Sequence, residues 1–229
     1  MNGKTIRESW DANAARWINV AREGRMPSRA VTSPAILNAA AAHAPDRVLD
    51  LGCGEGWLAR ALTEKTGAQV TGIDTSAVLI KAAQAEDPEN DYRVLAYEDA
   101  AADPARLGGP YDLVIANFAL FDEDLTPVLR VVAHALTPQG RFLIQTLHPS
   151  LLDPQEDGWR TEKWDRFAGE GWTDMPLYLR TMEGWQAVLA VAGFKLEETI
   201  EPRDNDGAPL SIIFAASKES PRPREGERA

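Results

Sequence analysis

The sequence is short of cysteine and of basic charge, and it has no long apolar run. Cys53 is the only cysteine, which excludes an intrachain disulfide, a zinc site built on several thiolates and a three-thiolate iron–sulfur cluster. A chain with one thiol is typical of a reducing compartment, so we expect a cytoplasmic protein. No stretch approaches the roughly twenty apolar residues of a membrane span, and no segment resembles a signal peptide, so we expect no membrane partner.

The charge balance indicates the kind of partner. The 24 Lys and Arg residues stand against 35 Asp and Glu residues, which gives a formal net charge of -11. Such a surface repels phosphate backbones and anionic lipids, so we expect a small molecule rather than a nucleic acid. With 229 residues, 44% of them hydrophobic, the chain suits one domain. The sequence has no cluster of metal-ligating residues, and no metal site is expected.

The hydrophobic period alternates between strand and helix along most of the chain. Short apolar runs predict strands, and apolar residues at spacings of three and four between them predict helices. Repeated strand–helix–strand units indicate a parallel sheet with helices on both faces. The predicted strands of this part are 48–51, 69–73, 92–97, 111–118 and 140–148.

The C-terminal part departs from this rhythm. The strand-like runs 195–202 and 211–218 are separated only by RDNDGAPL, which is too short for a helical crossover and predicts an antiparallel last strand. We therefore expect an α/β fold of the Rossmann-like type, with a seven-stranded, mostly parallel sheet. Residues 219–229 are charged and Pro-rich, and we expect a disordered tail there.

A glycine-rich loop follows the first predicted strand. It reads GCGEG at residues 52–56 and is followed by Trp57. Glycine at this place lets backbone N–H groups and a helix N-terminus face a ligand at the carboxyl edge of the sheet. A pyrophosphate-binding loop needs a small residue where Trp57 stands, and no Lys-Ser/Thr pair for a nucleoside triphosphate is present. Asp74 ends the second strand, 24 residues after Asp50, and suits the two hydroxyls of a ribose.

Four ordered segments carry a family resemblance. They are VLDLGCGEG at 48–56, GID at 72–74, YDLV at 111–114 and LTPQG at 136–140. They resemble the successive motifs of class I S-adenosylmethionine-dependent methyltransferases, in the small-molecule branch typified by ubiquinone-biosynthesis methyltransferases. The resemblance covers residues 46–218. It implies S-adenosylmethionine as cofactor, S-adenosylhomocysteine as product, and transfer of a methyl group to an O, N or S atom of a small molecule.

The resemblance also assigns the two ends of the cofactor. Asp50 and the glycine loop would hold the methionine moiety, while Asp74 would bind the ribose. Glu98 or Asp99, with the N–H of Ala100, would meet the adenine edge.

Asn117 and Phe118 would lie where the methyl group points. The residues around them lack the two prolines of the Asp/Asn-Pro-Pro-Tyr/Phe motif, which many amino-methylating enzymes of nucleic acids or proteins carry. The implied cofactor residues are Asp50, Gly52, Cys53, Gly54, Asp74, Thr75, Glu98, Asp99, Ala100, Asn117 and Phe118.

The sequence says less about the methyl acceptor. Residues 5–44 predict amphipathic helices, and residues 149–180 look irregular and carry Trp159, Trp164 and Trp172. We expect both segments to close over the site and to select a ring-bearing acceptor, although the tryptophans suit internal packing equally well. The candidate acceptor-binding residues are Trp17, Arg29, Trp159, Arg160, Tyr178 and Arg180.

His148 is the candidate catalytic residue. It ends the fifth predicted strand, at the edge where ligands bind in such sheets, and it is either a general base or a residue that orders the following loop. Arg29 is likewise either a contact for a carboxylate or part of a solvated helix face. Arg180 is a possible partner for an acceptor carboxylate.

The predicted organisation has three parts, in a monomer or a homodimer. A helical cap covers residues 1–44, a methyltransferase domain with the insert 149–180 covers 45–218, and the tail follows.

Two other functional classes stay open. A nicotinamide-dependent oxidoreductase shares a ribose-binding acid after a glycine loop, although Trp57 and the lack of a Tyr-x-x-x-Lys pair disfavour it. The other class is a protein that binds S-adenosylmethionine without catalysis.

Overall fold

A computed structural model describes residues 3–164 and 171–219. The expected tail therefore lies outside the described residues from residue 220 onward, as do six residues of the insert, 165–170. Within the described part, helices fall short of the combined length and apolarity that crossing a bilayer requires.

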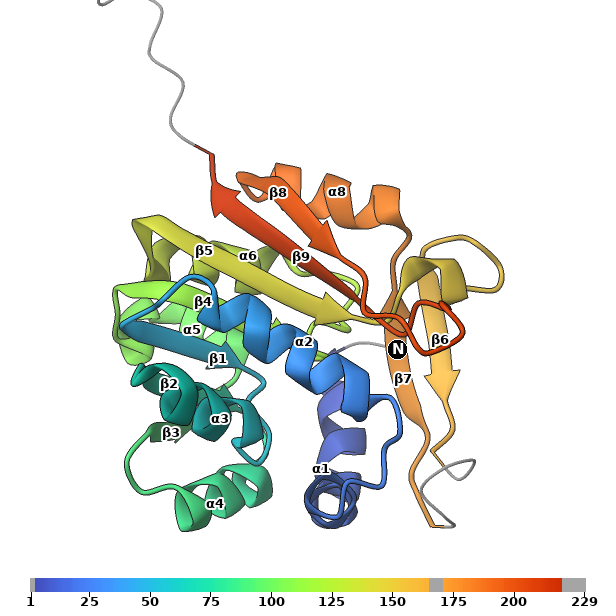
Figure 1. The fold of residues 1–229 in the computed structure, drawn as a ribbon, viewed down its shortest axis with the longest axis horizontal. Helices are drawn as coiled ribbons and strands as arrows, with labels where there is room; N and C mark the ends of the chain where they lie inside the picture. Colours follow the sequence, from blue (N-terminus) through green and yellow to red (C-terminus); the bar gives the residue numbers. More distant parts are fainter. Residues whose placement is uncertain (1–2, 165–170, 220–229) are drawn as a thin grey trace, which may run out of the picture.

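A seven-stranded sheet forms the centre of the fold (Figure 1). Its strand order is β3-β2-β1-β4-β5-β9-β8, and its neighbours are parallel except that β9 runs antiparallel to both β5 and β8. The expected Rossmann-like sheet with an antiparallel last strand is thus confirmed. The strands are β1 (Arg47–Leu51), β2 (Gln69–Asp74), β3 (Asp91–Val94), β4 (Tyr111–Asn117), β5 (Leu136–Thr146), β8 (Phe194–Ile200) and β9 (Ile212–Lys218).

Helices bury both faces of the sheet. Because successive strand residues point to opposite faces, Val48 packs with α2 and α3 on one side, while Leu49 packs with α6 and α8 on the other. The helical elements are α1 (Gly3–Arg22), α2 (Arg29–Ala41), α3 (Trp57–Thr66), α4 (Ala77–Glu86), α5 (Tyr97–Ala102), α6 (Thr126–Ala135) and α8 (Met182–Val191), with short 3-10 turns at Pro104–Leu107 and Pro149–Leu151.

Some sequence-based assignments are wrong. The third strand ends at Val94, and Tyr97 begins α5 instead of ending a strand. The insert is also less irregular than expected, because β6 (Gly158–Glu162) and β7 (Met175–Leu179) form an antiparallel ribbon of their own. Pro176 and the surrounding polar residues hide this ribbon in the sequence. A two-stranded ribbon tolerates proline because each of its strands is an edge.

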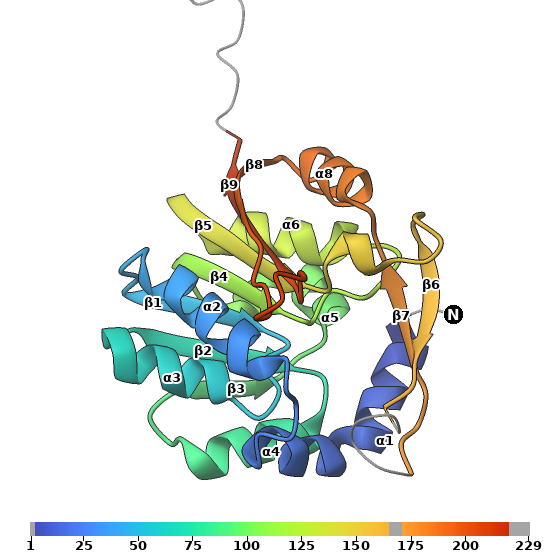
Figure 2. The ribbon, with the colours of Figure 1, turned by 45° about the vertical axis from the view of Figure 1, so that its right-hand side comes forward.

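Helix α1 and the β6–β7 ribbon stand together at the carboxyl ends of the parallel strands (Figures 1 and 2). The buried Asn13 side chain exchanges two hydrogen bonds with the backbone of Thr173, at 2.8 and 2.9 Å. Ser9 Oγ donates to the carbonyl of Asp174 at 2.7 Å. These bonds join α1 to a segment 160 or more residues later in the sequence, and we call α1 and residues 158–164 and 171–179 together the lid.

Candidate active site

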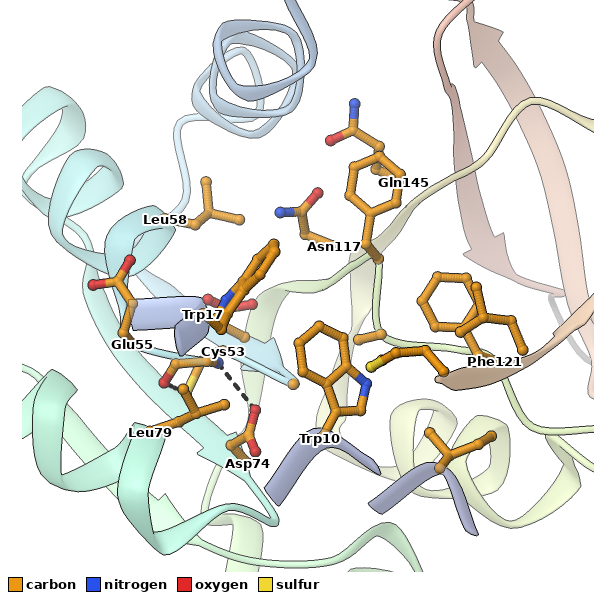
Figure 3. Close-up of a pocket in the computed structure, with 18 of the residues that line it drawn as sticks. Trp10, Trp17, Cys53, Glu55, Leu58, Asp74, Leu79, Asn117, Phe121 and Gln145 are labelled. Atoms are coloured by element: carbon orange, nitrogen blue, oxygen red, sulfur yellow. Dashed lines mark hydrogen bonds between the residues drawn. The ribbon is translucent and has the colours of Figure 1, made fainter. Parts of the chain in front are cut away.

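A cavity of about 380 Å³ lies between the lid and the carboxyl edge of the sheet. The glycine loop and Asp74 form one part of its wall, and the ends of β4 and β5 form another. In Figure 3, Asp74 and Gln145 lie on opposite sides of the cavity, and Trp10 and Trp17 of α1 lie between them. The cavity therefore lies at the carboxyl edge of the sheet, where parallel α/β sheets bind their ligands.

The glycine loop brings bare backbone to this chamber. Gly52 and Gly54 have φ angles of 69° and 58°, which non-glycine residues rarely adopt. A Cβ atom on Gly52 would lie 2.5 Å from Cβ of Ala119, so glycine is required there for packing as well. At Gly54 the nearest atom would be Trp17 Nε1 at 3.9 Å, because this residue faces the open cavity. The loop therefore leaves room for a ligand directly against its backbone.

Asp50 and Asp74 are the acids beside the loop. Burial raises the pKa of Asp50 to about 7, and the nearby charge of Asp74 adds to this shift. Burial also raises the pKa of Asp74 to about 6, although its carboxylate accepts hydrogen bonds from the N–H groups of Gly54 and Ser76 at 3.1 and 2.8 Å. Asp50 Oδ2 is buried and has no hydrogen-bond partner among the described residues. Both carboxyls can therefore accept hydrogen bonds from a bound molecule.

Arg29, at the start of α2, provides a positive charge in the cavity wall. Its guanidinium lies over the rings of Trp57 and Trp17, 4.7 and 5.8 Å from their centres. Nη1 of Arg29 is buried without a hydrogen-bond partner among the described residues. Burial lowers the pKa of Arg29, and the neighbouring Glu55 opposes this shift. Since Glu55 itself pairs with Arg60 at 2.6 Å, Arg29 keeps a free donor for a ligand.

The residues after β3 only partly match the adenine-binding expectation. Glu98 lines the cavity and pairs with Arg7 of α1 at 2.6 Å. Asp99 does not line this cavity and lies near Arg106, 3.7 Å away, while the N–H of Ala100 donates to the Ala96 carbonyl. The N–H of Ala100 is not available to a ligand because α5 begins at Tyr97 and this N–H forms a hydrogen bond at the start of the helix.

The end of β4 and the loop after it also contribute to the cavity wall. Asn117 and Phe118 line it as expected, and Phe118 holds a φ of 52° that is uncommon for a non-glycine residue. Phe121 and Asp122 also line the cavity. Burial raises the pKa of Asp122, and the charge of Glu98 adds to this.

Four tryptophans form a cluster within the lid. Trp17 and Trp10 meet edge to face at 5.4 Å, Trp17 meets Trp164 at 5.1 Å, and Trp172 stacks on Trp164 at 5.3 Å. Trp10, Trp17 and Trp164 line the cavity, whereas Trp172 packs behind them. The cluster therefore serves both as packing and as cavity wall.

Four predicted acceptor residues lie elsewhere. Trp159 packs edge to face against Tyr178 across the β6–β7 ribbon, and Arg160 donates to the carbonyls of Pro154, Glu156 and Trp159. Arg180 Nη2 donates to the carbonyls of Asp122 and Glu123, both at 2.7 Å. None of these four described residues lines the cavity. Met175 and Leu177 of β7 line the cavity, so the alternation of side chains along the strand places Tyr178 on its other face.

His148 also lies away from the cavity lining. Strand β5 ends at Thr146, so His148 belongs to the following loop. Its Nδ1 accepts from the N–H of Ser150 at 3.2 Å and lies 2.7 Å from Ser150 Oγ, while Nε2 lies 3.5 Å from Glu201. This arrangement corresponds to the loop-ordering alternative and not to a base beside a reacting group.

Sequence reasoning missed several cavity residues. Tyr97 was missed because the third strand was predicted to extend to this residue. Phe121, Asp122 and Leu177 belong to no sequence motif that would have marked them as cavity residues. Gln145 did give a signal, because its amide directly follows the apolar residues Phe142, Leu143 and Ile144 of β5.

Comparison with known proteins agrees with this geometry. A model of the methyltransferase domain family matches residues 48–140. Residues of this chain are 39% identical over 107 residues to the ubiquinone biosynthesis O-methyltransferase of Xanthomonas axonopodis pv. citri. The match spans 44% of this chain and 43% of that relative, so the chain matches less than half the length of this curated relative. An S-adenosylmethionine-dependent methyltransferase of Mesorhizobium loti is 26% identical, with a TM-score of 0.57 over 74% of this chain and 90% of that one.

Residues 48–140 of this chain match the methyltransferase domain family, and the chain has the fold of S-adenosylmethionine-dependent methyltransferases. Its architecture also matches the 1,6-didemethyltoxoflavin-N1-methyltransferase of Burkholderia thailandensis, solved with 1,6-didemethyltoxoflavin and S-adenosylhomocysteine. The TM-score is 0.65 over 95% of this chain and 88% of that one, at 18% identity, which is a likeness of fold. The methyltransferase domain thus includes the glycine loop and Asp74, while the lid lies outside the matched residues 48–140.

Proposed function

We propose that this protein transfers a methyl group from S-adenosylmethionine to an O, N or S atom of a small, ring-bearing molecule. The observation that carries the proposal is the single cavity that joins the glycine loop to an aromatic wall built by the lid. The relatives support the substrate class, since those named above include methyltransferases of ubiquinone biosynthesis and of a toxoflavin precursor.

The residues of the glycine-loop side fit the cofactor. The open space at Gly54 and the free Oδ2 of Asp50 suit the methionine moiety, whose amino group needs an acceptor. The free Nη1 of Arg29 suits its carboxylate. Asp74 would bind the ribose and Glu98 the adenine edge. When bound, S-adenosylmethionine supplies a methyl group already activated by its positive sulfur.

The lid has a different task in the proposal. Methyl transfer needs an acceptor held in line and water excluded, and positioning of this kind supplies much of the acceleration. Trp10, Phe121 and Leu177 are buried or half-buried apolar residues of the cavity wall that suit a flat ring. The lid would therefore hold the acceptor and close the chamber over it.

Calorimetry tests the proposal in two steps. S-Adenosylhomocysteine should bind, and NAD should not, because Trp57 occupies the place of the third glycine of a pyrophosphate loop. Methylated products should then form when the protein is incubated with labelled S-adenosylmethionine and a panel of phenols and nitrogen heterocycles. Binding of NAD in place of S-adenosylhomocysteine would favour the oxidoreductase, and binding without any transfer would favour the non-catalytic alternative.

A further inference from the structure

Gln145 is a buried polar side chain at the carboxyl end of β5. It lies on β5 beside Asn117 of β4, its register partner, and only 1% of the residue is exposed. Its neighbours Ile144 and Thr146 are also buried, yet Gln145 lines the cavity. A buried amide among apolar residues needs partners for both of its ends.

The orientation of this amide follows from its contacts. Nε2 donates to the carbonyl of Thr32 in α2 at 3.1 Å and lies 3.0 Å from Ser211 Oγ, just before β9. A backbone carbonyl can only accept a hydrogen bond, so the nitrogen must face Thr32 and the oxygen must face away from it. Two segments far from β5 in the sequence thus hold Gln145 in one orientation.

The oxygen held in this way has no hydrogen-bond partner among the described residues. Gln145 Oε1 is fully buried and unpaired, and so is Oδ1 of the adjacent Asn117. Buried acceptors of this kind are uncommon in folded proteins, because each loses its water without gaining a bond. Two neighbouring free acceptors in the wall of a ligand cavity indicate a ligand that donates hydrogen bonds.

The charges around the cavity favour the same kind of ligand. Arg7 is paired with Glu98, Arg29 lies over Trp57 beside the glycine loop, and Arg180 lies outside the cavity. The carboxyl of Asp122 adds negative charge to the wall. Among the described arginines of the cavity wall, Arg29 has the free donor, and the proposed function gives that donor to the carboxylate of the cofactor. An acceptor carboxylate would then compete with the cofactor for Arg29, whereas a neutral donor meets two free oxygens.

We propose that Gln145, with Asn117 beside it, forms the subsite that recognises the methyl acceptor. Its Oε1 accepts a hydrogen bond from an O–H or N–H group on the ring of a neutral acceptor, such as a phenol or an N–H heterocycle. This assignment rests on the proposed function, and it makes Gln145 a specificity-determining residue, with Thr32 and Ser211 as the groups that position it.

A matched pair of rings tests the subsite. Dissociation constants of 1-naphthol and 1-methoxynaphthalene, which lacks the O–H donor, are measured by calorimetry on protein saturated with S-adenosylhomocysteine. We expect the preference for 1-naphthol to be roughly fivefold to tenfold larger in the wild type than in Gln145→Met, the range for one neutral hydrogen bond. Gln139→Met changes an exposed glutamine of the same strand and should keep the wild-type preference. An unchanged preference in Gln145→Met would overturn the assignment.

A second measurement avoids the risk that Gln145→Met misfolds. In a crystal of the wild type with S-adenosylhomocysteine and 1-naphthol, the hydroxyl should lie within about 3.2 Å of Gln145 Oε1. A hydroxyl directed elsewhere, or a water fixed on Oε1 with the ring bound away from it, would overturn the assignment. Failure of the wild type to bind S-adenosylhomocysteine would count against the proposed function itself. Normal binding of S-adenosylhomocysteine without either ring would count against the subsite alone.

Discussion

The two sides of the cavity are built in different ways. The glycine-loop side comes from short, continuous segments, and backbone geometry makes its surface: positive φ angles at Gly52 and Gly54, and N–H groups directed at Asp74. The lid side is made of side chains from α1 and the segment of the β6–β7 ribbon. A hydrogen bond from Ser9 to the carbonyl of Asp174 joins these two parts across 165 residues of sequence. The glycine-loop side thus depends on short segments of backbone. The lid side depends on contacts between segments that are far apart in the sequence.

The largest effect is expected at Gly52, where the backbone side of this comparison is most constrained. Gly52→Val places a branched side chain at a φ of 69° and against Ala119, so we expect the free energy of unfolding to fall by about 3 kcal/mol or more. In Gly54→Ala the backbone φ is also unfavourable, but the new Cβ faces open space. We expect the free energy of unfolding to fall by about 1 kcal/mol in this variant. Denaturant unfolding measures both. Equal losses at the two positions would mean that the loop is not packed against Ala119.

Asp74 carries the next largest effect, on cofactor affinity. Asp74→Ala removes a carboxylate that holds the N–H of Gly54 and faces the cavity, so binding of S-adenosylhomocysteine should weaken by about 1.5–3 kcal/mol. Asp99→Ala is the matched control, because Asp99 lies outside this cavity near Arg106. Calorimetry compares the two. Similar losses in both variants would place the ribose near α5 instead.

Asp50 gives the glycine-loop side a pH dependence. Its folded pKa of about 7 lies above the ordinary value of 3.8, so the unfolded chain loses this proton first and stability falls as pH rises from about 4 to 7. Asp50→Asn cannot ionise, and its stability relative to the wild type should increase over this window by on the order of 1 kcal/mol per pH unit, then level off. Denaturant unfolding at several pH values measures the difference. A difference independent of pH would mean that Asp50 ionises freely in the folded protein.

Asn13 tests the long-range side. Asn13→Ala removes both hydrogen bonds to Thr173, so the docking of α1 should weaken by about 1–3 kcal/mol while affinity for S-adenosylhomocysteine changes little. Limited proteolysis within residues 5–30 should become faster. Asn19→Ala, an exposed change on the same helix, is the control. If Asn13→Ala weakens cofactor binding as much as acceptor binding, the two sides are not separable.

His148 carries the smallest expected effect. Because its ring bonds to Ser150 in the loop after β5 and does not line the cavity, His148→Gln should leave turnover within about twofold of the wild type. Steady-state kinetics across pH 6–9 provide the measurement. A tenfold or greater loss that shrinks at high pH would restore the general-base alternative.

The sequence predicted most of the sheet and several residues on the glycine-loop side of the cavity. Apolar runs located the strands, and the eight-residue gap before Ser211 predicted the antiparallel last strand. Asp50 and Asp74 lie at the carboxyl ends of β1 and β2, and Gly54 follows β1, so the three residues meet at one edge of the parallel sheet. The residues after β3 were harder to predict. The strand ends at Val94, three residues before the predicted end, so the N–H of Ala100 is bonded within α5 and is not free for a ligand.

Tertiary structure alone decided which of the other predicted side chains reach the cavity. The direction of Arg180, Trp159 and His148 depends on how the β6–β7 ribbon and the loop after β5 turn, and no local pattern encodes those turns. The free oxygen of Gln145 likewise exists only because Thr32 and Ser211 meet its nitrogen from distant parts of the chain. Sequence by itself determines backbone periods and the residues that end each strand, since these depend on neighbours a few positions away. Which side chains share a cavity depends on packing between segments that are far apart along the chain.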